Sequence, residues 1–188
     1  ARIDYSESDT MVSQSYYRHG QLHREGDVPA AIYYSINGTI EKQMWYRDSR
    51  LHRDGDGPAL ITYSNGTIML QSWYRDGHLH REGDLPALIK YRESGTIKSQ
   101  SWYRNDRLHR EGDLPAVYRY TDDGIMMSQC WYRDGLQHRD GDEPAVIYYS
   151  INGTIETQYW YRDGRYREGD GPARILYYES GAIKAEEW

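Results

Sequence analysis

One fifteen-residue stretch decides the fold: Trp73 to Ala87 reads W-Y-R-D-G-H-L-H-R-E-G-D-L-P-A. Close variants of it follow four other tryptophans. Successive tryptophans are 28, 29, 29, 29 and 28 residues apart, at Trp45, Trp73, Trp102, Trp131, Trp160 and Trp188, and Tyr16 stands 29 residues before the first of them. Self-similarity at such a period is typical of repeat proteins. The repeat is therefore the first fact to explain.

Between the copies of this stretch lies a second recurring segment, A-x-[I/Y]-x-Y, which runs through a Gly turn to the next tryptophan. It predicts a β-hairpin in each repeat. The expected hairpins lie near residues 1–16, 30–45, 59–73, 87–102, 116–131, 145–160 and 173–188. No composition change interrupts them, so we expect a single repeat domain over residues 1–188.

The local pattern is β throughout. Ala87, Ile89 and Tyr91 alternate with Leu88, Lys90 and Arg92, the period of two that places alternate side chains on opposite faces of a strand. Helical spacing is nowhere sustained. The sequence therefore predicts an all-β fold in which tandem hairpins of 28 or 29 residues form an elongated or curved antiparallel meander or solenoid.

Asn-Gly-Thr occurs three times, at residues 37–39, 65–67 and 152–154. Asn and Gly both tolerate positive φ, so the pair indicates a tight hairpin turn. The same triplet matches the acceptor pattern for N-glycosylation, although the turn explains it without that modification. One repeat is a residue shorter at Ser64-Asn65-Gly66 and another at 164–167, which we interpret as deletions absorbed by turns, because a slip inside a strand would turn its side chains to the wrong face.

Composition excludes several classes of partner. The chain has 23 Lys and Arg against 29 Asp and Glu, a net charge of −6, so we expect neither nucleic acid nor an anionic membrane as a partner. The single cysteine, Cys130, excludes an internal disulfide framework and a four-cysteine zinc site. Tyrosine and tryptophan provide all the aromatic residues, 20 and 6 respectively, which suits a half-buried sheet surface.

The motif H-R-[E/D]-G-D suggests two interpretations. A His with an Asp four residues later could hold a divalent metal ion, and the candidate pairs are His23 and Asp27, His52 and Asp56, His80 and Asp84, His109 and Asp113, and His138 and Asp142. Alternatively the motif is a Gly turn in which the acid accepts hydrogen bonds while Arg pairs with an acid or stacks on Trp. We favour the turn, since the sixth copy, Tyr166 to Asp170, has no His, and we predict no cofactor.

Catalysis is not expected. An active site needs one asymmetric cluster of residues, whereas every His, Asp and Glu of the corner recurs in register. No Gly-rich phosphate loop or nucleophile elbow is present.

The most prominent candidate contact residues are tryptophans and the arginines that follow Trp-Tyr. They are Trp45, Trp73, Trp102, Trp131, Trp160, Arg75, Arg104, Arg133 and Arg162. Trp, Tyr and Arg concentrate binding energy at protein interfaces. Two alternatives remain: the arginines cover aromatic rings within the chain, or the face stacks sugar rings.

Two segments, Tyr33 to Ile40 and Trp73 to His80, resemble the Y-Y-x-N-G-x-L pattern of MORN-variant repeats of the kind found in YwqK-like antitoxin proteins. The corner at 80–87 and 109–116 is similar to repeat arrays of giant viruses of amoebae. The resemblance covers essentially the whole chain. It implies an all-β hairpin array used for scaffolding or partner binding, in an intracellular or virus-particle-associated protein.

We therefore predict a noncatalytic structural, scaffolding or protein-interaction protein that forms part of a larger assembly. The alternatives are a glycan- or divalent-metal-binding module and an antitoxin-like inhibitor. The first and last strands should have unpaired edges, and we expect a protein partner or self-association to cover them.

Overall fold

The computed structural model describes residues 1–169 and 171–188, and every regular element in these ranges is a β-strand. The described residues include no helix that could span a membrane. The chain divides into two compact units, Ala1–Glu82 with Ala87–Thr96 and Gly83–Pro86 with Ile97–Trp188. Each unit is built from antiparallel hairpins, which confirms the predicted all-β hairpin repeat; a single domain over the whole chain stays a prediction.

In the first unit, long strands follow one another in a meander. Their order is β1 (Arg2–Tyr5), β2 (Met11–Ser15), β5 (Ala31–Tyr34), β6 (Ile40–Met44), β9 (Leu60–Ser64), β10 (Thr67–Ser72) and β13 (Leu88–Tyr91). Short two-residue strands connect the hairpins as β3 (Tyr17–Arg18) with β4 (Gln21–Leu22), β7 (Tyr46–Arg47) with β8 (Arg50–Leu51), and β11 (Tyr74–Arg75) with β12 (His78–Leu79).

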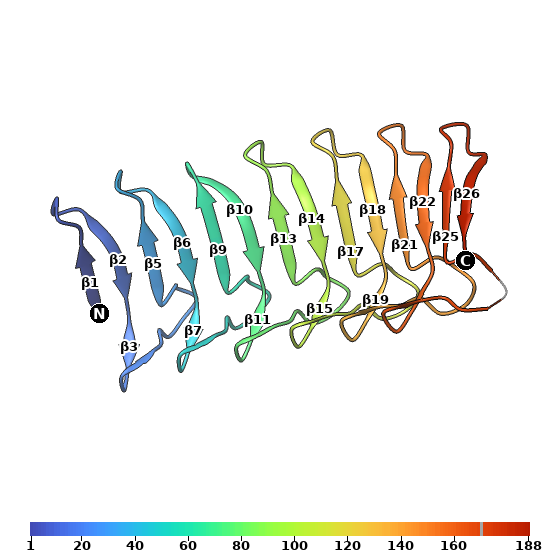
Figure 1. Ribbon diagram of the computed structural model, residues 1–188. Coiled ribbons are helices and arrows are strands. Elements are labelled where there is room, and N and C mark those ends of the chain that lie inside the picture. Colours follow the sequence, from blue (N-terminus) through green and yellow to red (C-terminus); the bar gives the residue numbers. More distant parts are fainter. Residues whose placement is uncertain (170) are drawn as a thin grey trace. The chain divides into compact units, whose positions relative to one another are not determined.

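The second unit repeats this plan. Its long strands are β14 (Ile97–Ser101), β17 (Val117–Tyr120), β18 (Met126–Cys130), β21 (Val146–Tyr149), β22 (Ile155–Tyr159), β25 (Arg174–Tyr177) and β26 (Ile183–Glu187). Its short pairs are β15 (Tyr103–Arg104) with β16 (Arg107–Leu108), β19 (Tyr132–Arg133) with β20 (Leu136–Gln137), and β23 (Tyr161–Arg162) with β24 (Arg165–Tyr166). Within each unit the short pairs lie at the end of the long hairpins opposite their turns (Figure 1).

The hairpin turns are of two kinds. Asn65 and Gly66 have φ of 49° and 79° and form a two-residue turn, with Ser64 paired to Thr67. At Asn37 and Asn152 only the glycine of the Asn-Gly pair has positive φ. The extra residue there lengthens the turn, so that the asparagine can keep an ordinary negative φ. The one-residue deletion at Ser64-Asn65-Gly66 is thus confined to the turn, as predicted.

Each fully described long hairpin has an irregularity that the alternating pattern did not predict. The register shifts by one residue near the turn, for example between Tyr33 and Tyr34 and between Arg119 and Tyr120. A bulge of this kind bends the strand and changes the side-chain alternation locally.

The core is a narrow band at the base of the hairpins. The alanine after each Pro is buried, with Ala59, Ala87, Ala116 and Ala145 all 0% exposed. Small polar residues fill neighbouring positions: Ser72, Ser101, Ser128 and Thr157 are buried. The recurring apolar residues of the core are therefore Ala and Trp, and Ser or Thr fills other buried positions.

A hydrogen-bonded ladder of tyrosine and glutamine runs along one face of each unit. Tyr63 donates its hydroxyl proton to Gln43 Oε1 at 2.7 Å, and Tyr149 donates to Gln129 Oε1 at 2.6 Å. The same bond joins Tyr91 to Gln71, Tyr120 to Gln100, and Tyr177 to Gln158. Burial raises the pKa of Tyr63 and Tyr149. The ladder satisfies the polar tips of half-buried rings.

Candidate functional site: the corner between hairpins

Each corner begins with a tight turn after Trp-Tyr-Arg. In the fifth corner, Asp134 and Gly135 have φ of 50° and 90°, which favours Gly and short polar residues. The returning chain donates the His138 N–H to the Trp131 carbonyl at 3.1 Å. Trp131 in turn donates its backbone N–H to the Ala145 carbonyl at 2.8 Å. Both backbone groups of the tryptophan are thus held where the chain leaves the long hairpin.

Arg139 joins the tryptophan to the preceding corner. Its guanidinium lies 4.1 Å from the centre of the Trp131 ring system and donates two hydrogen bonds of 2.7 Å to the Asp113 carboxylate. A third bond, of 3.2 Å, goes to the Pro144 carbonyl. The Arg139 side chain is only 13% exposed. We call this arrangement of Arg, Trp and the preceding Asp the clasp.

The clasp recurs at other corners with nearly constant geometry. The Arg-to-ring distance is 4.0 to 4.1 Å in three further copies, formed by Arg53, Trp45 and Asp27, by Arg81, Trp73 and Asp56, and by Arg110, Trp102 and Asp84. In the first repeat Arg24 covers Tyr16 at 3.7 Å instead. A two-bond Arg–carboxylate pair fixes orientation as well as distance, so the clasp sets the spacing of neighbouring corners.

A second group of charged residues lies on the outer side of the corner. Arg133 contacts the Asp140 carboxylate at 3.3 Å, His138 Nδ1 at 3.2 Å and the Asp163 carboxylate at 3.1 Å. We call such a set the outer network. Two equivalents are Arg47 with Asp54, His52 and Asp76, and Arg104 with Glu111, His109 and Asp134. Arg133 is 45% exposed, so it remains accessible to a partner.

The histidine of the outer network has partners at both ring nitrogens. Asp163 approaches His138 Nδ1 with its backbone N–H at 3.2 Å and with its carboxylate at 2.9 Å. His138 Nε2 lies 2.8 Å from the Asp140 carboxylate. His52 and His109 receive the same backbone bond, from Asp76 and Asp134. Both ring nitrogens are used within the protein.

The carboxylates of the corner are held in their charged form. The Arg139 and Arg110 guanidinium groups lower the pKa of Asp113 and Asp84 respectively through hydrogen bonds. The hydrogen bond from His138 lowers the pKa of Asp140. Hydrogen bonds to an ionised carboxylate favour that form, which is why acidic groups remain charged beside the arginines.

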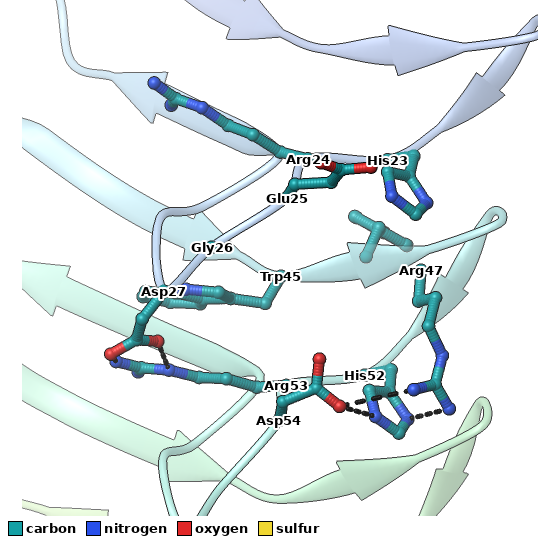
Figure 2. Close-up of a pocket in the computed structure, with 11 residues that line it drawn as sticks. His23, Arg24, Glu25, Gly26, Asp27, Trp45, Arg47, His52, Arg53 and Asp54 are labelled. Atoms are coloured by element: carbon teal, nitrogen blue, oxygen red, sulfur yellow. Dashed lines mark hydrogen bonds and ion pairs between the residues drawn. The ribbon is translucent and has the colours of Figure 1, made fainter.

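Cavities lie between successive corners within each unit. In the first unit a cavity of about 290 Å³ is bounded by His23, Glu25, Trp45 and Asp54 among others (Figure 2). Figure 2 shows Arg53 beneath the Trp45 ring, bonded to Asp27, while Arg47, His52 and Asp54 form a separate group. In the second unit the matching cavity, between residues 109–114 and 131–141, measures about 440 Å³. Charged groups of both signs line these cavities.

The structure separates the predicted contact residues into two sets. The five tryptophan rings are buried, at 6 to 8% exposure, and belong to the core rather than to the accessible surface. Arg75, Arg104 and Arg133 lie half-exposed in or beside outer networks. Arg162 instead donates to the Gly141 carbonyl at 2.7 Å. Of these predicted contact residues, the arginines are exposed and the tryptophans are buried.

The structure gives the His and the Asp of the predicted metal pairs different partners. In the corners whose His and Asp lie in one unit, the aspartate joins the clasp, as at Asp27, Asp56 and Asp113, while the histidine binds acids of the outer network. His80 has Glu82 at 3.4 Å, and Asp84 pairs with Arg110. No group of three or more His, Cys, Asp or Glu within residues 1–169 and 171–188 is placed to hold a metal ion.

The sixth corner lacks the histidine, and its arginine is arranged differently. Arg167 donates its backbone N–H to the Trp160 carbonyl at 2.9 Å, the bond that His makes in other corners. Its side chain also lies 4.9 Å from the Trp160 ring centre and donates to the Pro172 carbonyl at 2.7 Å. Arg167 therefore supplies both the backbone bond to the Trp160 carbonyl and the side chain beside the Trp160 ring. Arg167 thus stands where the other corners have His; Asp170 lies outside the described residues.

Two features were not predicted from the sequence. The first is that the aspartate of one corner bonds to the arginine of the next. The two residues are always about one repeat apart in the sequence, and this constant spacing could have indicated the pair. The second is the Tyr–Gln ladder, whose partners are 19 or 20 residues apart in every copy.

The fold and corners define an all-β protein of tandem hairpins joined by Trp–Arg clasps. No protein-family model and no curated protein matches the chain. The resemblance to MORN-variant repeats and the expected self-association through terminal strand edges stay predictions.

Proposed function

We propose that the protein is a noncatalytic interaction or scaffolding protein that binds a protein partner along its corners. The observation that carries the proposal is the recurrence of the outer network with a half-exposed arginine, at Arg47, Arg104 and Arg133. Arginine is enriched at the energetic centres of protein interfaces. Within the second unit, Arg104 and Arg133 would suit a partner with recurring acidic or carbonyl groups.

The acids of the outer network support the proposal because they hold the outer arginines in place. Each outer arginine has one acid of its own corner and one of the following turn, as Arg133 has Asp140 and Asp163. Its side chain is therefore positioned before a partner arrives. Preorganised side chains lose less conformational entropy on binding. The outer arginines can therefore bind a partner by stacking and ion pairing, without a reactive pocket.

The test compares outer arginines with exposed lysines on the long hairpins. The chain carrying Arg104→Ala and Arg133→Ala should lose at least tenfold affinity for a partner that the unchanged protein retains from its native source. The control, Lys90→Ala with Lys98→Ala, removes the same charge from the long hairpins and should keep the affinity. Circular dichroism checks that both variants fold.

The partner is first identified by quantitative mass spectrometry and then purified for titration. A partner that binds both variants equally well would refute the outer networks as the binding surface. Binding to a glycan array, with no retained protein, would favour the alternative of a sugar-binding module.

A further inference from the structure

The three Asn-Gly-Thr turns differ in a way that affects their chemistry. All three asparagines, Asn37, Asn65 and Asn152, are exposed. Asn65-Gly66 is the two-residue turn, with positive φ at both residues, whereas the turns at Asn37 and Asn152 are one residue longer. The same dipeptide therefore occurs in two backbone conformations.

The longer turns hold the glycine amide in a hydrogen bond. Gly38 donates its N–H to the Ser35 carbonyl at 2.9 Å, and Gly153 donates to the Ser150 carbonyl at 2.9 Å. A hydroxyl pair closes each of these turns as well, with Ser35 Oγ to Thr39 Oγ1 at 2.7 Å and Ser150 Oγ to Thr154 Oγ1 at 2.8 Å. The amides of Gly38 and Gly153 are thus engaged.

The Gly66 amide is different. Among the residues that the structure describes, the Gly66 N–H has no hydrogen-bond acceptor. The nitrogen is therefore free to lose its proton to water.

We propose that Asn65 is a site of spontaneous deamidation in the folded protein, and that it reacts faster than Asn37 and Asn152. The Gly66 nitrogen loses its proton and attacks Asn65 Cγ, a new C–N bond forms, and the side-chain amide leaves as ammonia. Water then opens the cyclic imide at either carbonyl. The products are aspartate, or isoaspartate when the main chain runs through the former side chain.

The rate difference follows from the two turn conformations. Attack by Gly38 or Gly153 first requires loss of the bond to a Ser carbonyl and opening of the braced turn, and breaking a hydrogen bond adds to the barrier. Asn105 is a further internal comparison, since it also has positive φ but is followed by Asp106 rather than by a glycine. Asn65 is the fastest of the four asparagines.

Deamidation would alter the hairpin formed by β9 and β10. Either product adds a negative charge at the turn. Isoaspartate also lengthens the main chain by one carbon, which a two-residue turn cannot absorb without disturbing the pairing of Ser64 with Thr67. The modified hairpin should exchange its amide protons faster than the corresponding hairpin of β5 and β6.

The experiment incubates the intact protein at mildly alkaline pH and follows each asparagine by peptide mapping and mass spectrometry. Enzymatic methylation of isoaspartate gives an independent readout. In the folded protein, Asn65 should deamidate several-fold faster than Asn37 and Asn152. In concentrated urea the three rates should converge, because the turns are then lost.

Two variants separate turn geometry from local sequence. Insertion of Ile between Ser64 and Asn65 recreates the Ser-Ile-Asn-Gly-Thr turn and should slow Asn65 to the rate of Asn37. Deletion of Ile36 shortens the other turn and should accelerate Asn37. Equal rates in the folded protein, or a rate at Asn65 that the insertion leaves unchanged, would overturn the proposal.

Discussion

The fifth and sixth corners, around Trp131 and Trp160, belong to the same unit but are held differently. Arg139 covers Trp131 at 4.1 Å and forms a two-bond ion pair with Asp113. Arg167 lies 4.9 Å from the Trp160 ring centre, and its Nε is buried without a hydrogen-bond partner. The two rings are equally well buried, at 6% and 8% exposure.

The difference shows which part of the corner is indispensable. The backbone bond to the tryptophan carbonyl survives the missing histidine, because Arg167 supplies it. The ion pair to the preceding corner does not survive among the described residues. Burial of the ring therefore does not depend on the complete clasp, whereas the link between neighbouring corners does.

The largest expected effect is loss of either ring. Trp131→Ala and Trp160→Ala should each lower the free energy of unfolding by about 3–5 kcal/mol, the usual cost of truncating a buried aromatic residue. Urea denaturation followed by circular dichroism measures both. Trp188→Ala is the control, since that ring is 76% exposed and its removal should change stability by less than about 0.5 kcal/mol. A small cost at Trp131 would contradict its place in the core.

The arginines should separate the two corners. Arg139→Ala removes a stacked guanidinium and bonds to Asp113 and Pro144, so it should cost about 2–3 kcal/mol. Arg167→Ala removes a more distant cation and one side-chain bond, and should cost about 1 kcal/mol.

The same urea titrations compare these variants. Arg139→Lys serves as a control, because lysine keeps the charge but cannot make the two-bond pair. Equal losses at Arg139 and Arg167 would show that the clasp adds nothing beyond covering the ring.

The repeat, the strands and the turns could be predicted because each depends on local chemistry. The tryptophan spacing, the alternation at 87–92 and the Gly turns indicate hairpins without reference to distant residues. The deletion at Ser64-Asn65-Gly66 was correctly assigned to a turn for the same reason, since only a turn can lose a residue without reversing the faces of a strand.

The candidate site was predicted only in part. Stacking of an arginine on tryptophan was among the alternatives. The sequence could not distinguish Arg139, whose side chain is mostly covered, from Arg133, which is half-exposed, because the two residues differ only in the side of the corner on which they lie. The partner of Asp113 lies 26 residues away, across two turns. Such pairings follow from how hairpins stack, which period and composition do not specify.

Acid should weaken the clasps. Arg110 and Arg139 lower the pKa of Asp84 and Asp113 from an ordinary value of 3.8. A carboxyl whose pKa is lower in the folded state stabilises the fold above its unfolded value, and that contribution is lost as pH falls through the folded value. Stability should therefore decline below pH 3.8 as these two groups take up protons.

Urea midpoints measured from neutral pH to pH 3 test this expectation. The variant with Asp84→Asn and Asp113→Asn should start less stable at neutral pH and lose less on acidification than the unchanged protein. Each pair is more than half exposed on its acidic side, so solvent screening keeps the effect modest. Parallel curves for the two proteins would show that these carboxylates do not stabilise the fold.

The smallest effect should come from repairing the sixth corner. Insertion of His between Tyr166 and Arg167 restores the length of the other corners, so the histidine can take the bond to the Trp160 carbonyl and release Arg167 from its double role. The arginine could then approach the ring and reach Asp142, in the way that Arg139 reaches Asp113. We expect a gain of about 1 kcal/mol in the free energy of unfolding, the sum of a closer stack and a partly exposed ion pair.

Insertion of Ala at the same position restores the length without an imidazole. A gain with both insertions would attribute the effect to length, and a gain with His alone would attribute it to the imidazole. A loss with both would mean that the shorter corner is the better fit for this repeat.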